Sequence, residues 1–462
     1  MKLFSFPKKK KYDNQFLEKI EGLLNHSLGN DSMTNYPSHS KLFECGELLI
    51  KHCNLNKEPA LFCVNFINHT EISLLKGGSE GHFILWQKIL DAFSNSLPES
   101  AYCGHTTNGV VIHLWGDACE KKLLETIHKI SGSLKKLKFT HRPLVLHSGY
   151  TVYPEDTETL IQVQPLTVSS TMAALYPEPD PLSSRIQRFT KEIEKNVIHN
   201  LNTESAVIEA VKNHDFSLFY QPQFELKTGK LIGAEALARF SSSGLSLSKT
   251  YEYILIIENN SYIIDFTKFS FMKLIMFYQE YRHHISPEFR FSFNLSPAIL
   301  NWSYFDFVDF VTSHVRQIPD IAKHLTIEVT ETAYCSEQQG EYLLTILKGL
   351  KELGIKIAID DFGSGYGSMK LLASDIPHII KLDRTLTTDI CSGSSTGIYI
   401  QKLIQSINLT GHNILCEGIE TEIQKDFLIE HDVAYGQGYW YAKPMPDKKF
   451  INFIAENDTF SI

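Results

Sequence analysis

The second half of the chain alternates short apolar runs with segments of helical length, and this alternation restricts the fold more than any other feature. Strands that alternate with helices predict a parallel sheet. About eight strands over roughly 250 residues predict a TIM-like (β/α)8 barrel of the α/β class. The strand-like runs occur at residues 216–224, 231–237, 291–295, 325–329, 355–359, 379–382 and 414–416, with a last one near Tyr435.

An open, doubly wound sheet is the alternative architecture for the same alternation. Such a sheet normally carries a glycine-rich nucleotide-binding loop after its first strand. The sequence has no such loop after residues 216–224. The closed barrel is therefore the prediction for residues 203–460.

Seven of the apolar runs carry a polar side chain at or near their end. A buried strand can present one polar side chain at its tip, and the tips of barrel strands meet at one face. Crowded carboxylates repel one another, so their convergence predicts bound cations. Hard oxygen ligands without clustered cysteine or histidine favour Mg²⁺ or Mn²⁺ over zinc. The residues are Glu235, Asn294, Glu328, Asp360, Lys381, Glu417 and Gln437.

The neighbouring Asp360 and Asp361 are the most informative pair in this set. Two adjacent carboxylates at a strand end can each hold a different cation. Two metal ions about 3.5–4 Å apart can clamp a phosphate for in-line attack. Lys381 is then expected to act as a point charge or to orient the attacking water. A single strand-end acid is more often a cap or turn former, so the prediction depends on the whole set.

Composition and charge restrict the class of protein. A chain of 462 residues predicts two or three domains. The net charge of −9 argues against a general binder of nucleic-acid polymers. Eight scattered cysteines without a Cys-x-x-Cys pair favour reduced thiols in a cytosol. With no signal peptide and no uncharged apolar segment of membrane-spanning length, a cytoplasmic protein without a transmembrane segment is expected.

The first half of the chain has a different organisation. We expect a helical segment over residues 1–56 and a small α/β domain over 57–178, with strands at 60–66, 109–115 and 143–153. The breaker cluster Pro177-Glu-Pro-Asp-Pro marks a boundary. Apolar residues at helical spacing over 184–201 then predict a linker helix within 179–202.

At its polar tips the chain resembles the EAL-domain cyclic di-GMP phosphodiesterases of bacteria, over residues 200–458. The order of the motifs is highly specific. By this resemblance the protein hydrolyses cyclic di-GMP to linear pGpG with two divalent cations, Mg²⁺ or Mn²⁺, and a homodimer is expected by analogy. The motifs are Tyr220-Gln-Pro, Glu235-Ala-Leu, Asn294-Leu-Ser-Pro, Glu328-Val-Thr-Glu331, Asp360-Asp-Phe-Gly-Ser-Gly-Tyr, Lys381-Leu-Asp-Arg384, Glu417-Gly-Ile-Glu420-Thr and Gln437-Gly-Tyr.

The resemblance also implies a role for each site residue. Asp361 belongs to the second cation or is shared with it, and Lys381 contacts the catalytic water. Glu331 anchors the loop after Asp361, and Gln437 supports the site. Catalytic roles are implied for Glu235, Lys381, Glu417 and Glu331, and substrate contacts for Gln221, Arg239, Asp383 and Gln437. The implied ligands of the first cation are Glu235, Asn294, Glu328, Asp360 and Glu417.

The chain departs from the family pattern at three positions. Gly367 stands where serine is usual, Phe240 replaces tryptophan or histidine, and Cys416 replaces alanine. None of these changes removes a ligand, although Gly367 is expected to loosen the loop near the second cation. Two other functions remain open. One is a receptor that binds cyclic di-GMP without cutting it, and the other is a scaffold that recognises a protein.

The first α/β domain faintly resembles a GGDEF domain, which synthesises the same dinucleotide. Ser148-Gly-Tyr-Thr-Val-Tyr and Met172-Ala-Ala-Leu-Tyr are similar to its later landmarks. The signature turn reads Thr106-Thr-Asn-Gly-Val, and the expected metal aspartates are missing near Asn65. Nucleotidyl transfer needs carboxylates that hold Mg²⁺, so the domain is expected to lack cyclase activity. It would sense, regulate or dimerise, or be a relic with structural value only.

Overall fold

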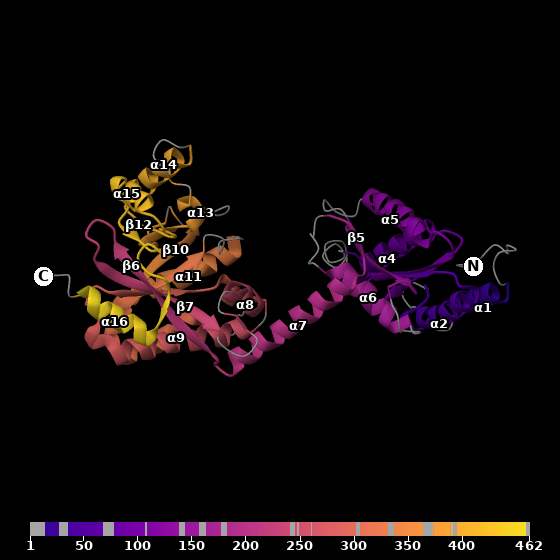
Figure 1. Ribbon diagram of the computed structural model, residues 1–462, viewed down its shortest axis with the longest axis horizontal. Helices are drawn as coiled ribbons and strands as arrows, with labels where there is room; N and C mark the ends of the chain where they lie inside the picture. Colours follow the sequence, from indigo (N-terminus) through magenta and orange to yellow (C-terminus); the bar gives the residue numbers. More distant parts are fainter. Residues whose placement is uncertain are drawn as a thin grey trace. The chain divides into compact units, whose positions relative to one another are not determined.

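The computed structural model divides the chain into two compact units, Met1–Leu201 and Asn202–Ile462 (Figure 1). Each unit has its own hydrophobic core. The structure describes residues 14–458 except 27–35, 68–77, 107–108, 138–143, 157–162, 177–182, 241–244, 247–248, 260, 302–304, 331–336, 364–371, 373, 389 and 391–394.

The first unit is a five-stranded sheet of order β2-β3-β1-β4-β5 between helices. Strands β1, β3 and β4 are almost wholly buried along their length, which requires helices on both faces. Helix α2 packs against α6, and α4 packs against α5. The elements are α1 Asn14–Asn25, α2 His39–Asn56, β1 Ala60–Ile67, α4 Gly78–Ser94, β2 Ala101–Thr106, β3 Gly109–Trp115, α5 Cys119–Lys136, β4 Leu146–Tyr153, α6 Val163–Leu175, β5 Arg185–Arg188 and the first part of α7 Lys191–Lys212, which continues into the second unit.

Two parts of this unit differ from the sequence-based expectation. Helices α1 and α2 contribute Phe16, Ile20 and Leu49 to the same core as the sheet, so these two helices are not separate from the small α/β domain. The helix expected over 184–201 begins only at Lys191. Residues Arg185–Arg188 before it form β5, a short strand parallel to β4.

Asn65 lies at the centre of the sheet and joins three strands. Its side chain is wholly buried in β1. Its amide nitrogen donates to the carbonyl of Val110 in β3 at 2.9 Å, and its oxygen accepts from Ser148 in β4 at 2.7 Å. A buried amide with both ends bonded stabilises the sheet.

Helix α6 packs unusually close to β4 because Gly149 has no side chain. A Cβ atom added to Gly149 would lie 2.0 Å from the carbonyl oxygen of Ser170 and 2.2 Å from the nitrogen of Ala174. Both atoms belong to the backbone of α6, so the helix itself would have to move. The glycine therefore sets the distance between the helix and the sheet.

The second unit is a closed barrel of eight strands with helices outside it (Figure 1). The ring runs from β6 through β7, β8, β9, β10, β11 and β12 to β13, which pairs with β6, so an open doubly wound sheet is excluded. A short additional strand, β14, also pairs with β6. The strands are β6 Phe216–Glu225, β7 Leu231–Phe240, β8 Arg290–Asn294, β9 Leu325–Thr330, β10 Lys356–Phe362, β11 Ile379–Leu382, β12 Asn413–Cys416, β13 Tyr435–Gly436 and β14 Met445–Pro446.

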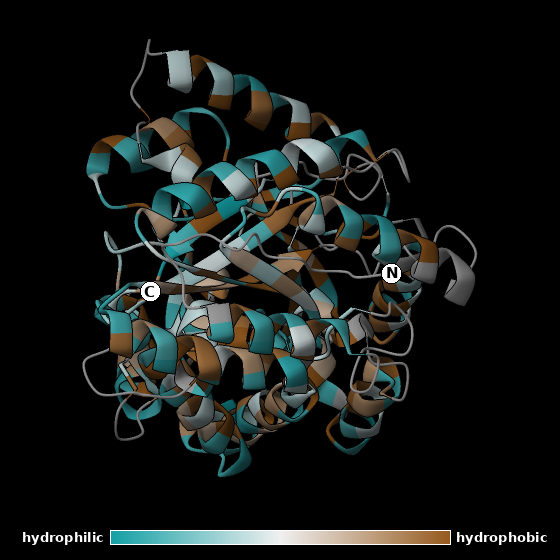
Figure 2. Ribbon diagram, turned by 90° about the vertical axis from the view of Figure 1, so that its right-hand side faces the viewer, coloured by the Kyte–Doolittle hydropathy of each residue, from teal (hydrophilic) through white to brown (hydrophobic). Residues whose placement is uncertain are grey.

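Helices of the protein combine apolar and polar residues, which Figure 2 shows as brown and teal. Helices also surround the barrel (Figure 1). Their apolar side chains, together with the C-terminal part of α7, complete the barrel core. They are α8 Thr250–Glu258, α9 Tyr262–Tyr281, η2 Arg282–His284, η3 Pro297–Asn301, α10 Phe307–Gln317, η4 Pro319–His324, α11 Glu337–Glu352, α13 Arg384–Thr387, α14 Ser395–Leu409, α15 Glu422–Glu430 and α16 Asp447–Asp458.

The barrel is not wholly parallel, which corrects the sequence-based expectation. Strand β6 runs antiparallel to both of its neighbours, β7 and β13. The connection from Glu225 to Leu231 is a tight turn, in which Gly229 has φ of +70° and donates to Glu225 at 2.9 Å. A parallel crossover needs a dozen residues or more. A connection this short therefore permits only a hairpin.

Helix length and cysteine state add two further observations. No helix in the described ranges is both long and apolar enough to cross a lipid bilayer. The cysteines that the structure describes are free and buried: Cys45, Cys53, Cys63, Cys103, Cys119 and Cys416.

The close approach of α6 to β4 gives a prediction for Gly149→Ala. The added methyl group collides with backbone, so we expect the first unit to lose about 1–3 kcal/mol of unfolding free energy. Gly132→Ala is the matched control, since Gly132 lies exposed in α5 with nothing within 4 Å of a Cβ atom. That change should stabilise α5 by about 0.5–1 kcal/mol. Urea unfolding, with hydrogen exchange to identify the unit, measures both, and equal effects would contradict the packing argument.

Candidate metal centre and substrate pocket

Neighbouring barrel strands bring the predicted carboxylates together. Glu235 lies in the middle of β7, Glu328 in β9 and Asp360 in β10, and all three side chains are buried. Glu417 follows β12 directly, and its backbone amide donates to Leu382 at the end of β11. Asn294 ends β8 beside Glu328 and donates to Glu235 Oε1 at 2.8 Å. The sequence-based convergence at one end of the barrel is thus present in the structure.

Lys381 in β11 lies at the centre of these carboxylates with no solvent-exposed surface. Its Nζ atom is 2.7 Å from Glu328, 2.8 Å from Glu417 and 2.9 Å from Asp360. A fourth carboxylate, Glu235, is 3.6 Å away. One ammonium group therefore lies close to acids from β7, β9, β10 and the end of β12.

Two glutamines, Gln437 and Gln223, hold the carboxylates in place through hydrogen bonds. Gln437 donates to Glu235 Oε2 at 2.7 Å and to Glu417 Oε1 at 3.1 Å. Its own oxygen accepts from Gln223 in β6 at 2.9 Å, which fixes the orientation of the amide. Gln223 was not among the residues predicted from the sequence. The signal for it was the alternation of Gln221 and Gln223 in an otherwise apolar strand.

A β-bulge at the end of β10 turns two successive aspartates toward one place. Side chains alternate across a regular strand, so Asp360 and Asp361 would point to opposite faces. Between Ile359 and Phe362, however, β10 has one residue more than β11 opposite it, and Asp361 has φ of +55°. A left-handed backbone is strained for aspartate, by about 1 kcal/mol or more. The bulge brings oxygens of Asp360, Asp361 and Glu417 within 4.8 Å of one another.

The electrostatics of the cluster reflect burial and one cation shared by several acids. Burial raises the pKa of Glu328 well above its ordinary value and that of Glu417 to about 8, although Lys381 opposes both shifts. Burial also disfavours ionisation of Glu235, but Lys381 and the amides of Gln437 and Asn294 outweigh it and lower the pKa of that carboxyl. For Asp361, burial and then Asp360 raise the pKa to about 6.

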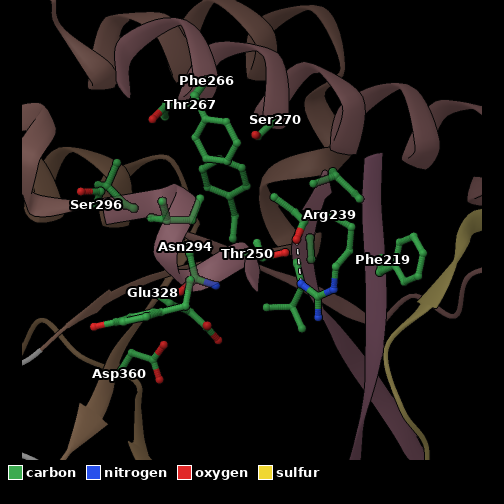
Figure 3. A pocket seen from close by; sticks show the side chains of 18 of the residues that line it. Phe219, Arg239, Thr250, Phe266, Thr267, Ser270, Asn294, Ser296, Glu328 and Asp360 are labelled. Atoms are coloured by element: carbon green, nitrogen blue, oxygen red, sulfur yellow. Dashed lines mark hydrogen bonds between the residues drawn. The ribbon is translucent and has the colours of Figure 1, made fainter. Parts of the chain in front are cut away.

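A pocket of about 790 Å³ opens beside this cluster (Figure 3). Asn294, Glu328 and Asp360 form one side of it, and Arg239 and Phe219 lie across from them. Its remaining polar and aromatic lining includes Glu258, Thr267, Ser270, Ser296, Asp361, Tyr439 and Lys443. The pocket therefore joins acidic groups to cationic and aromatic ones, and Lys381 contacts its acids from the buried side.

Of the remaining residues predicted from the sequence, several lie away from the pocket or outside the described residues. Gln221 is buried in β6, where it donates to the carbonyl of Ala442 at 3.4 Å, and it does not line the pocket. Asp383 accepts from the amide of Thr385 at 2.8 Å and caps α13. Glu331 and Gly367 lie outside the described residues. Ser296, which donates to Glu258 at 2.6 Å, is a pocket contact that the sequence did not reveal.

The donor atoms fit hard divalent cations. Oxygens of Glu235, Glu328 and Asp360 lie within 4.8 Å of one another and form one group of possible ligands. Asp360, Asp361 and Glu417 form a second group, so Asp360 belongs to both. Carboxylate oxygens are the preferred ligands of Mg²⁺ and Mn²⁺. A buried excess of acid over base, as found here, is a further sign of a cation site.

Comparison with known proteins agrees with the barrel and its motifs. A model of the EAL domain family matches residues 204–444, just over half of the chain. The cyclic di-GMP phosphodiesterase PdeL of Escherichia coli K12 is 25% identical over 277 residues, which cover 59% of this chain and 75% of PdeL.

Two further relatives extend the comparison. Uncharacterized protein sll1895 of Synechocystis sp. is 25% identical over 338 residues, or 72% of this chain, which spans only about half (47%) of that protein. The cAMP-bound form of the EAL enzyme Bd1971 superposes with a TM-score of 0.51 at 25% identity. The superposition covers 57% of this chain and 73% of that one.

The raised pKa of Asp361 predicts how stability depends on pH when metal is removed. The folded state binds this proton more tightly than the unfolded state, because the pKa is about 6 against 3.8. Its contribution to stability is therefore lost as pH rises from about 4 to about 6. Urea unfolding in EDTA should show a decline about 1 kcal/mol larger in the parent protein than in Asp361→Asn, allowing for partial exposure. Parallel declines in the two proteins would contradict the assignment.

Proposed function

Because the chain belongs to the EAL domain family, we propose that it is a metal-dependent phosphodiesterase that hydrolyses cyclic di-GMP to the linear dinucleotide pGpG. The observation that carries this proposal is the pair of carboxylate groups that share Asp360 at the edge of the pocket. Two neighbouring cation sites suit in-line displacement at a phosphodiester. A receptor without catalysis would need the pocket but not the second group of acids.

Two divalent cations would occupy these two groups. Glu235, Asn294, Glu328 and Asp360 would hold the first, and Asp361, with Asp360 and Glu417, the second. Glu417, which the resemblance assigns to the first cation, is placed with the second because it is grouped with Asp360 and Asp361. When bound, such ions supply charge neutralisation of the phosphodiester and activation of the attacking water.

The side chains of the chain itself position the reacting groups. Gln437 holds the Glu235 and Glu417 carboxylates at fixed separation, because it donates to both. Burial lowers the pKa of Lys381, but the carboxylates around it outweigh burial and raise that pKa well above the ordinary value. Its positive charge therefore stays beside the place where negative charge develops in the transition state.

The opposite wall offers complementary chemistry for a dinucleotide. Arg239 and Lys443 line the pocket as cations and can pair with phosphate oxygens. Phe219 and Tyr439 present aromatic faces on which a nucleobase can stack. Of the four substrate contacts expected from the sequence we assign Arg239, because Gln221, Asp383 and Gln437 do not line the pocket.

Hydrolysis of cyclic di-GMP with Mg²⁺ or Mn²⁺ is the direct test. Chromatography should show pGpG with the parent protein, and Glu235→Ala should lower turnover at least about 100-fold, because it removes a ligand of the first cation and the partner of Gln437. Glu288→Gln is the control, since Glu288 is an exposed barrel acid paired with Lys230 at the surface. Retention of intact cyclic di-GMP by the parent protein would favour a receptor, and no binding would favour a scaffold.

Asp361→Asn should separate turnover from binding. The variant loses a ligand of the second cation but keeps Arg239, Lys443 and the aromatic wall, so turnover falls at least about 100-fold. The Kd for a phosphorothioate analogue that resists hydrolysis should stay within about threefold of the parent value, which is less than 1 kcal/mol. Calorimetric titration of both proteins measures this. An equal loss of binding and turnover would contradict the division of roles.

A further inference from the structure

We infer that Lys381 is a built-in counter-ion that competes with the first divalent cation for the same carboxylates. Metal occupancy would then be set by exchange between an internal ammonium group and an external ion. The inference rests on the proposed function only in taking the site to bind divalent cations. It concerns how the site stays folded without them and how tightly it binds them.

Lys381 is in ion-pair contact with several carboxylates at once. An ammonium group has three hydrogens to donate. Glu328, Glu417 and Asp360 lie 2.7, 2.8 and 2.9 Å from Nζ, so three carboxylates form ion pairs with one ammonium group, and Glu328 Oε2 accepts a hydrogen bond from it. These acids come from separate segments of the barrel, which a surface lysine could not reach together.

The same oxygens belong to both possible cation sites. Glu328 and Asp360 are members of the first group of ligands, and Asp360 and Glu417 of the second. In the part of the chain that the structure describes, no other lysine or arginine forms an ion pair with these three acids or with Glu235. Gln437 and Asn294 donate hydrogen bonds but bring no charge.

The lysine is held in place by the sheet, so it is always available. Its strand β11 pairs with β10 on one side and with β12 on the other, and Lys381 itself pairs with Leu415. A tethered group acts at a high effective concentration. A divalent cation therefore has to displace the ammonium group or share its ligands, and each weakens binding of the other to the same extent.

Two consequences follow for a protein without the lysine. Without metal, its buried carboxylates have no charged partner, and breaking a buried ion pair in this way is strongly destabilising. With metal, the competitor is gone and the cation binds more tightly. Folding should therefore depend on metal much more strongly than in the parent protein.

The experiment compares Lys381→Met and Lys381→Gln with the parent chain in EDTA and during Mn²⁺ titration. In EDTA the melting temperature of the barrel should fall by about 10 °C in both variants. The Mn²⁺ concentration at half-saturation should fall on the order of tenfold. It is measured from the electron paramagnetic resonance signal of free Mn²⁺. Lys356→Met is the matched control, since Lys356 begins β10 at the opposite end of the barrel and should change neither quantity.

A double variant keeps the test decisive if Lys381→Met does not fold in EDTA. Glu328→Gln removes one of the repelling acids, so Glu328→Gln combined with Lys381→Met should fold better in EDTA than Lys381→Met alone. Rescue of folding by Mn²⁺ or by Glu328→Gln supports the inference. Strictly additive effects, an unchanged Mn²⁺ midpoint, or failure of both rescues would overturn it. None of these readouts requires hydrolysis, so a protein that exchanges lysine for metal without cutting cyclic di-GMP would refute the proposed function alone.

Discussion

Repulsion between buried carboxylates is the constraint on which the rest of the site depends. Glu235, Glu328, Asp360 and Glu417 lie around one ammonium group, and water is largely excluded from them. Like charges in such a place must be protonated, paired or bound to a cation. Uncharged amides then do the positioning. Gln437 joins Glu235 to Glu417, and Gln223 holds Gln437, so the arrangement is rigid without adding further charge.

The backbone contributes as much as the side chains. The second group of ligands exists only because β10 has one extra residue before Phe362, with Asp361 in a left-handed conformation. A regular strand would leave Asp361 on the far face of the sheet. The strained backbone of Asp361 lowers local stability, and it places the Asp361 carboxylate beside those of Asp360 and Glu417. The site is therefore specified by strand pairing as well as by the identity of the acids.

Much of the barrel and its acids could be predicted, and the exceptions have physical causes. Glu328 and Asp360 are recognisable because a carboxylate at the end of a mostly apolar run is conspicuous. The bulge is not, since an adjacent pair of aspartates looks the same in a regular strand. The reversed direction of β6 had a signal in the short, glycine-containing connection before Leu231. Strand β5 was concealed because three of its four residues are polar, whereas the apolar residues around it have helical spacing.

The closure of the barrel has a consequence for how the site fluctuates. Strand β13 is only two residues long, and it joins the ring through two residue pairs with β12 and two with β6. Gln437 follows it immediately and bonds both Glu235 and Glu417. We expect the barrel to open locally at β13 more easily than at its longer strands, because few backbone hydrogen bonds must break there. Each such opening would release the Gln437 amide from the Glu235 and Glu417 carboxylates. The lifetime of the assembled site would therefore depend on the rate of local opening at β13 and not on the unfolding of the whole barrel.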